Sequence, residues 1–197
     1  LGMVNLFPTL PEQRKIADFL TAVDGRIGQL IQKKALLEDY KKGVMQQLFT
    51  QAIRFKDDHG NDFPDWEEKD LIKVASPVKK KNRDMAVELV LTNSAIQGII
   101  SQRDYFDKDI ANAKNIGGYY VVSRDDFVYN PRISETAPVG PIKRNHLSTG
   151  VMSPLYTVFR FNEGDATFFE FYFQTSEWHK YMNSIANFGA RHDRMAI

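Results

Sequence analysis

The 197-residue sequence contains no cysteine, which excludes disulfide bridges, thiolate metal ligands and a cysteine nucleophile. It has no apolar run of the roughly 18–20 residues that a membrane-spanning helix needs, and it does not open with a charged and then apolar leader. Its four histidines are spaced neither as HxxxH nor as HExxH, so we expect no metal site. These absences predict a cytoplasmic protein that does not bind a membrane.

Motifs for nucleotide binding and catalysis are also missing. There is no GxxxxGK[ST] loop, no GxGxxG after a predicted strand and no GxSxG nucleophile elbow. Tyr129, Asn130 and Pro131 resemble the Asn-Pro-Pro-aromatic signature of amino-methylating DNA methyltransferases, but the second proline and the aromatic residue are absent. Carboxylate pairs such as Asp57 and Asp58 lie in predicted turns. We therefore expect no catalytic residue and no cofactor; an enzyme with a substrate-assisted mechanism is the alternative that no residue supports.

The net charge of +1 hides a segregation of charge along the chain. Residues 56–70 hold seven acidic side chains and two basic ones, whereas residues 71–83 hold five basic side chains and no acidic one. Residues 136–162 again lack an acidic side chain but contain three lysines or arginines. The small net charge therefore does not exclude an anionic partner such as a phosphate backbone.

Residues 12–49 are predicted to form one helix, roughly 55 Å long at 1.5 Å per residue. Pro11 stands where the first turn of a helix tolerates proline, and no proline follows until Pro64. Apolar side chains recur at alternating steps of four and three residues, which is the heptad pattern of a coiled coil. The predicted helix-pairing residues are Ile16, Leu20, Val23, Ile27, Leu30, Leu37, Val44 and Leu48. Lys34 and Lys41 occupy two further positions of this seam.

A long helix with a one-sided apolar stripe needs a partner that covers the stripe. The rest of the sequence offers no second heptad segment of matching length. We therefore expect this helix to pair with a helix of another chain, either a second copy or a different protein. A surface helix lying on its own domain is the alternative.

The remaining chain is predicted to form a compact α+β domain, so the expected fold class is a long coiled-coil-forming helix followed by a mixed α/β domain. Residues 1–11 are a lead-in to the helix, residues 50–70 an acidic linker rich in turn formers, and residues 71–197 the domain itself. An aromatic-rich helical pattern covers residues 167–185. The predicted strands are residues 87–92, 98–101, 119–122, 127–129 and 151–161.

Three basic clusters lie in predicted loops, where binding residues often concentrate on a rigid scaffold. Any one cluster is also compatible with a solvated surface. Lysine and arginine neutralise phosphates, and arginine and asparagine can read base edges. The residues predicted to contact phosphates are Lys79, Lys80, Lys81, Arg83, Lys143 and Arg144. Those predicted to reach base edges are Asn145, Arg191 and Arg194, and ion pairing with a carboxylate is the alternative for Arg191.

Several segments carry a resemblance to one family. The stretch LPEQRKIA at residues 10–17 resembles the start of the conserved helix in specificity subunits of type I restriction–modification systems. The stretch KGVMQQLF at residues 42–49 is similar to the end of that helix, and NDFPDWE at residues 61–67 to the start of a target recognition domain. Further similar segments are GYYVV at 118–122, DFVYN at 126–130, VGP at 139–141, GVMSPLY at 150–156 and GAR at 189–191.

The resemblance implies a subunit in which two target recognition domains alternate with two long helices that pair antiparallel as a spacer. Each domain would read one half of a split site in double-stranded DNA. The chain holds one such helix and one such domain, so the resemblance places it in the middle of a full subunit. The implied partners are the modification (methyltransferase) subunit, the restriction (motor and endonuclease) subunit and a second specificity half. The chain itself would be non-catalytic, since methylation and cleavage belong to those separate subunits.

The competing interpretation is a non-catalytic coiled-coil interaction module with no role in nucleic-acid binding. It accounts equally well for the long helix and for the missing catalytic motifs. It does not account for the segregated basic loops.

Overall fold

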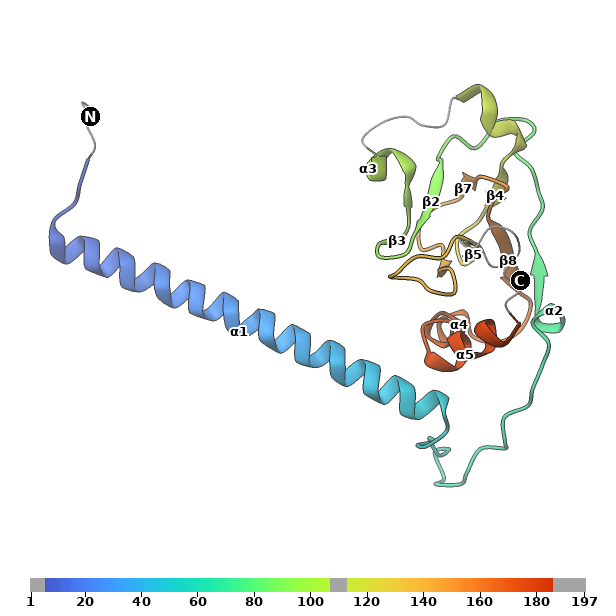
Figure 1. Cartoon of the computed structure of the whole chain (residues 1–197), viewed down its shortest axis with the longest axis horizontal. Coiled ribbons are helices and arrows are strands. Elements are labelled where there is room, and N and C mark those ends of the chain that lie inside the picture. Colours follow the sequence, from blue (N-terminus) through green and yellow to red (C-terminus); the bar gives the residue numbers. More distant parts are fainter. Residues whose placement is uncertain (1–5, 107–112, 186–197) are drawn as a thin grey trace. The chain divides into compact units, whose positions relative to one another are not determined.

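The computed structural model describes residues 6–106 and 113–185 (Figure 1). The chain divides into two compact units, Leu1–Leu48 and Phe49–Ile197. A single long helix dominates the first unit, and all the strands belong to the second. The predicted α+β class with a long N-terminal helix is therefore confirmed.

Helix α1 spans Leu10–Phe49, slightly longer at its start than the predicted helix. Glu12 lies in its first turn, where a negative charge favours the positive end of the helix dipole. None of its residues is buried, and the seam side chains from Ile16 to Leu37 are between 40% and 56% exposed. The predicted apolar seam is thus present and uncovered within its own unit.

The second unit is built on antiparallel strands (Figure 1). Its larger sheet has the order β1 (Ala75–Pro77), β8 (Thr157–Phe161), β5 (Phe127–Tyr129), β6 (Ile142–Arg144). Two smaller sheets pair β2 (Leu91–Ser94) with β3 (Gly98–Ser101), and β4 (Tyr120–Val122) with β7 (Gly150–Met152). Strands β1 and β6 consequently lie at opposite edges of the larger sheet.

Short helices complete the second unit. They are α2 (Leu71–Val74), α3 (Gln102–Phe106), the 3-10 helix η1 (Ala113–Gly118), α4 (Ala166–Tyr172) and α5 (Ser176–Ile185). Asp165 caps α4 because its carboxylate accepts hydrogen bonds from the backbone N–H groups of Thr167 and Phe168.

The core surrounds β5, which is paired on both sides and buried on both faces. Phe127 and Tyr129 share one cluster with Trp178 and Met182 of α5. Val128, which alternates with them along the strand, belongs to a second cluster on the other face. Each fully buried large apolar side chain contributes about 1.5–3 kcal/mol to folding. The two clusters hold β5 and β8 in place, and these two strands support the polar edge of the larger sheet.

Two predicted segments are each divided into two elements. Residues 151–161 form β7 and β8, because a turn in which the Tyr156 N–H donates to the Ser153 carbonyl separates them. Residues 167–185 form α4 and α5, because α4 ends at Tyr172 and α5 begins only after Thr175. The Thr175 N–H donates to the Tyr172 carbonyl, and its hydroxyl accepts from the Trp178 N–H at 3.3 Å. Strands β1 and β6 were not predicted.

Candidate nucleic-acid interface

The segment that follows β1 connects two sheets in an extended conformation. The Val78 N–H donates to the Val158 carbonyl of β8 at 2.8 Å. Further along, the Lys80 carbonyl accepts from the Val121 N–H at 2.8 Å, which ties the same segment to β4. The backbone of this basic stretch is therefore fixed on both sides by hydrogen bonds to strands.

Four cations of this stretch are exposed: Lys79, Lys80, Lys81 and Arg83. None of them forms an ion pair within residues 6–106 and 113–185. Uncompensated cations on a rigid edge create a local positive potential that favours polyanions. We refer to residues 79–83 as the lysine segment.

A buried asparagine holds the turn of the lysine segment. Asn82 is 1% exposed, its side-chain amide donates to the Val87 carbonyl at 2.8 Å, and its side-chain oxygen accepts from the Val87 N–H at 3.1 Å. Its carbonyl also accepts from the Met85 N–H. Asn82 is therefore a structural residue between Lys81 and Arg83, which remain exposed.

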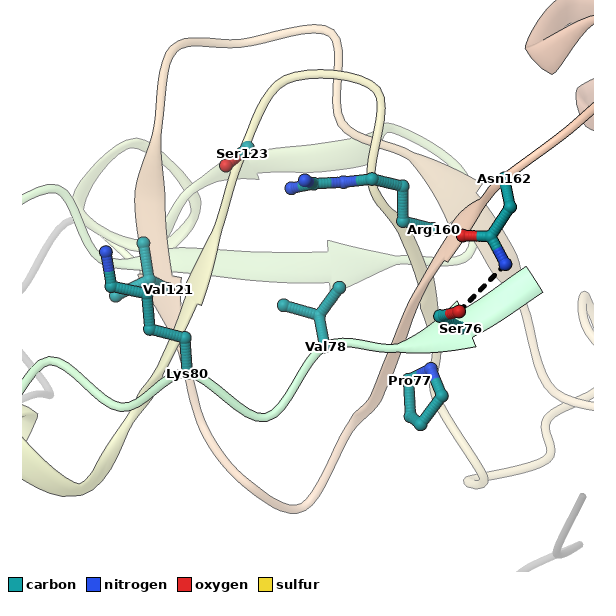
Figure 2. A pocket seen from close by; sticks show the side chains of 8 residues that line it. All are labelled: Ser76, Pro77, Val78, Lys80, Val121, Ser123, Arg160 and Asn162. Carbon is teal, nitrogen blue, oxygen red and sulfur yellow. Dashed lines mark hydrogen bonds between the residues drawn. The ribbon is translucent and has the colours of Figure 1, made fainter.

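A shallow cavity of about 430 Å³, lined by both polar and apolar residues, adjoins the lysine segment (Figure 2). The extended stretch lines it with the alternate residues Ser76, Val78 and Lys80 and also with Pro77. Val121 and Ser123 line it from the β4 side. Because alternate residues of an extended chain share one face, each stretch presents one set of side chains to the same space.

Arg160 of β8 and Asn162, which directly follows the strand, supply the third wall of the cavity. The Asn162 side-chain amide donates to the Ser76 hydroxyl oxygen at 2.8 Å, as the dashed line in Figure 2 shows. Arg160 Nε and Nη2 donate to the two carboxylate oxygens of Asp126, at 2.6 and 3.1 Å. This bidentate pair raises the pKa of Arg160, and it orients the guanidinium along the cavity wall.

The prediction for Lys143 and Arg144 needs correction. These residues lie in β6 rather than in a loop, at the sheet edge opposite β1, so they do not join the lysine segment. The Arg144 guanidinium forms ion pairs with Asp125 at 2.7 Å and Glu170 at 3.6 Å, and its side chain is only 16% exposed. Burial lowers the pKa of Lys143, and the charge of Glu170 partly opposes this shift. Arg144 therefore stabilises the fold, and its charge is already compensated.

Asn145 cannot read a base edge in this structure, because it is fully buried. Its side-chain amide donates to the carbonyls of Ser123 and Ser148, and its side-chain oxygen accepts from the Leu147 N–H at 3.0 Å. The prediction for Asn145 was wrong for a physical reason: a short side chain next to a strand satisfied the local backbone instead of solvent.

Arg191 and Arg194 lie outside the described residues, so their predicted contact with base edges remains a prediction. The cavity residues Ser76, Ser123 and Asn162 were not predicted, and Arg160 was counted only among the three basic residues of positions 136–162. The period-two alternation of polar residues around Arg160 and Asn162 was a usable signal, but it required knowing that β8 and β1 are neighbours.

Metal sites and membrane-spanning helices are both absent from the part of the chain that the structure describes. No group of three or more His, Asp or Glu side chains there could hold a metal ion. No helix of these residues is long and apolar enough to cross a bilayer.

The chain matches no protein-family model and no curated protein. The sequence motifs and the geometry of the lysine segment are therefore the features that bear on function.

Proposed function

We propose that this chain is the sequence-specific DNA recognition subunit of a type I restriction–modification complex. The observation that carries the proposal is the lysine segment, which presents four exposed and uncompensated cations on a hydrogen-bonded edge. The family is suggested by the resemblance of the helix and of the domain segments to specificity subunits. The second unit acts as a target recognition domain that reads one half of a bipartite site in double-stranded DNA.

The energetic core of the proposed mechanism is the neutralisation of phosphates. Lys79, Lys80, Lys81 and Arg83 contact the backbone and release counterions, which makes affinity strongly dependent on salt. Base edges are read by side chains of neighbouring loops, among which Arg191 and Arg194 are the proposed candidates.

The proposed partners follow from this role. The recognition subunit selects the DNA sequence. The modification and restriction subunits, bound in the same cytoplasmic complex, carry out methylation and cleavage. Helix α1 pairs through its apolar seam with the helix of a second specificity half, and the length of the pair sets the distance between the two half-sites.

The first test is a titration of random-sequence duplex DNA at two salt concentrations. Replacing Lys79, Lys80 and Lys81 together with Gln is expected to weaken binding to all sequences and to reduce the salt slope by about one per lost phosphate contact. The matched control replaces Lys56, Lys69 and Lys73, which are ion-paired lysines, with Gln. Equal losses in both triple variants would mean that only net charge matters.

The alternative function is a coiled-coil interaction module without a nucleic-acid role, and the uncovered seam of α1 favours it as much as it favours the proposal. The same titration separates the two functions. Absence of salt-sensitive binding, both alone and with a purified modification subunit, would favour the interaction module.

A further inference from the structure

We propose that the cavity between β1, β4 and β8 holds a single phosphodiester group of the DNA backbone. The inference rests on the proposed function and deepens it, because it names one site that binds a backbone phosphate directly instead of attracting the DNA only through charge. The charge, the hydrogen-bond donors and the surroundings of the cavity support this site.

The charge of the cavity fits a monoanion. Lys80 contributes one positive charge, and the positive charge of Arg160 is shared with Asp126, which is fully buried and faces the protein. Among the residues that the structure describes, no acidic side chain lines the cavity. The sum is therefore close to one positive charge, which suits a phosphodiester better than the doubly charged phosphate of a free monoester.

The guanidinium is positioned before any ligand arrives. Asp126 accepts from Arg160 Nε and Nη2 and also from the Ser123 N–H at 2.7 Å, so the carboxylate is held from two sides. Arg160 Nη1 has no partner among the described residues and stays available to an anion. A preformed cation loses little conformational freedom on binding, which favours affinity.

Hydroxyl donors complete the site. The Ser76 oxygen accepts from Asn162, which leaves its hydrogen to be donated to another acceptor. The Ser123 hydroxyl has no partner among the residues that the structure describes, and it lines the same space. Two hydroxyls and two cations, with no carboxylate among the described lining residues, form the donor set that a phosphate oxygen requires.

The surroundings favour a backbone phosphate over a free nucleotide. The cavity is shallow, and the described residues that line it include no aromatic side chain on which a base could stack. Lys79 and Lys81 flank Lys80 and alternate to the opposite face of the extended segment. They are therefore free to contact other phosphates while Lys80 reaches the cavity.

The test compares adjacent lysines in the full chain. Lys80→Gln removes a cavity cation, and Lys79→Gln removes a neighbouring exposed cation that does not line the cavity. With random-sequence duplex DNA we expect Lys80→Gln to cost about 10-fold in affinity, and Lys79→Gln clearly less. Lys80→Gln leaves the Arg160–Asp126 pair intact, so it stays informative where an arginine variant fails to fold.

A second variant tests coupling between the two cations. In the Arg160→Lys background, Lys80→Gln is expected to cost much less than in the wild type, whereas the cost of Lys79→Gln stays the same. DNA binding should also shift the amide resonances of Ser76 and Ser123 in a nuclear magnetic resonance spectrum.

The outcomes distinguish the two proposals. DNA binding in which Lys79→Gln and Lys80→Gln have equal effects, each additive with Arg160→Lys, would overturn the cavity site and leave the DNA-binding function standing. If DNA does not bind but inorganic phosphate shifts the Ser76 and Ser123 resonances, the cavity holds free phosphate, and both proposals are wrong. If neither probe binds, either to the chain alone or in the presence of a purified modification subunit, both are wrong as well.

Discussion

A fully buried carboxylate destabilises a protein unless it is paired, and Asp126 is paired twice, with a strand arginine and with a backbone N–H. The local sequence does not indicate this pairing, because Asp125 and Asp126 are adjacent acids typical of a solvated turn. In the structure Asp126 turns inward to Arg160, whereas Asp125 pairs with Arg144. Both arginines are thus paired with an adjacent acid, but Arg160 keeps its Nη1 without a partner among the described residues, whereas all three nitrogens of Arg144 are engaged.

Gly140 shows how strictly a single position can be constrained. Its φ of +75° lies in the left-handed region, and an added Cβ would overlap the Asn130 carbonyl oxygen and lie 2.8 Å from the Tyr129 ring. We expect Gly140→Ala to destabilise the second unit by roughly 3 kcal/mol or more. Gly98, with a φ of +78° and open space around it, is the control, and Gly98→Ala should cost only about 1 kcal/mol.

Urea unfolding followed by tryptophan fluorescence measures both glycine variants. Trp66 and Trp178 are the two tryptophans of the chain and both belong to the second unit, so the signal reports that unit alone. Equal destabilisation by the two substitutions would show that the close contacts at Gly140 relax at little cost.

His179 makes the stability of the second unit depend on pH. Burial lowers the pKa of His179 below its usual 6.5, so the unfolded chain binds a proton that the folded chain resists. The free energy of unfolding should therefore fall as the pH drops from 7 through 6.5, and this contribution should level off below the folded-state pKa. Urea unfolding at several pH values should show a smaller decrease for His179→Gln than for His59→Gln, a change in an exposed turn.

At the scale of elements, local sequence patterns predicted those helices and strands whose formation depends mainly on residues close in sequence. The heptad spacing located α1, and β3 and β5 coincide with predicted strands because their β-branched and aromatic runs are bounded by turns. Strands β1 and β6 escaped prediction, since they are short edge strands whose pairing depends on distant partners. The cavity escaped for the same reason: its walls come from three stretches that only tertiary pairing brings together.

Helix α1 carries its own prediction. Leu20→Glu together with Ile27→Glu places two charges on the apolar seam and should convert a self-associated chain into a monomer. Gln29→Glu together with Gln32→Glu adds the same charges off the seam and should leave association unchanged. Sedimentation equilibrium measures both, and a wild-type chain that is monomeric at all concentrations, with circular dichroism showing an intact helix, would contradict self-pairing.

At the scale of the whole molecule, the proposed function links DNA binding by the second unit to pairing of chains through the long helix. A pair of chains presents two lysine segments to one duplex, so the phosphate contacts of both add to the salt dependence. The Leu20→Glu and Ile27→Glu variant should therefore bind random-sequence DNA more weakly, with a salt slope about half that of the wild type. An unchanged slope, measured by fluorescence anisotropy at several salt concentrations, would mean that each chain binds DNA independently.

The pairing of β1 with β8 also has a consequence for biosynthesis. Asn162 and Ser76, which meet in the cavity, are separated by 86 positions in the chain. The lysines therefore leave the ribosome well before the strand that carries Arg160, and loop closure over such a distance is among the slower steps of folding. A partly synthesised chain has the positive charge but not the cavity. The proposed binding of a phosphate in the cavity therefore requires the complete second unit.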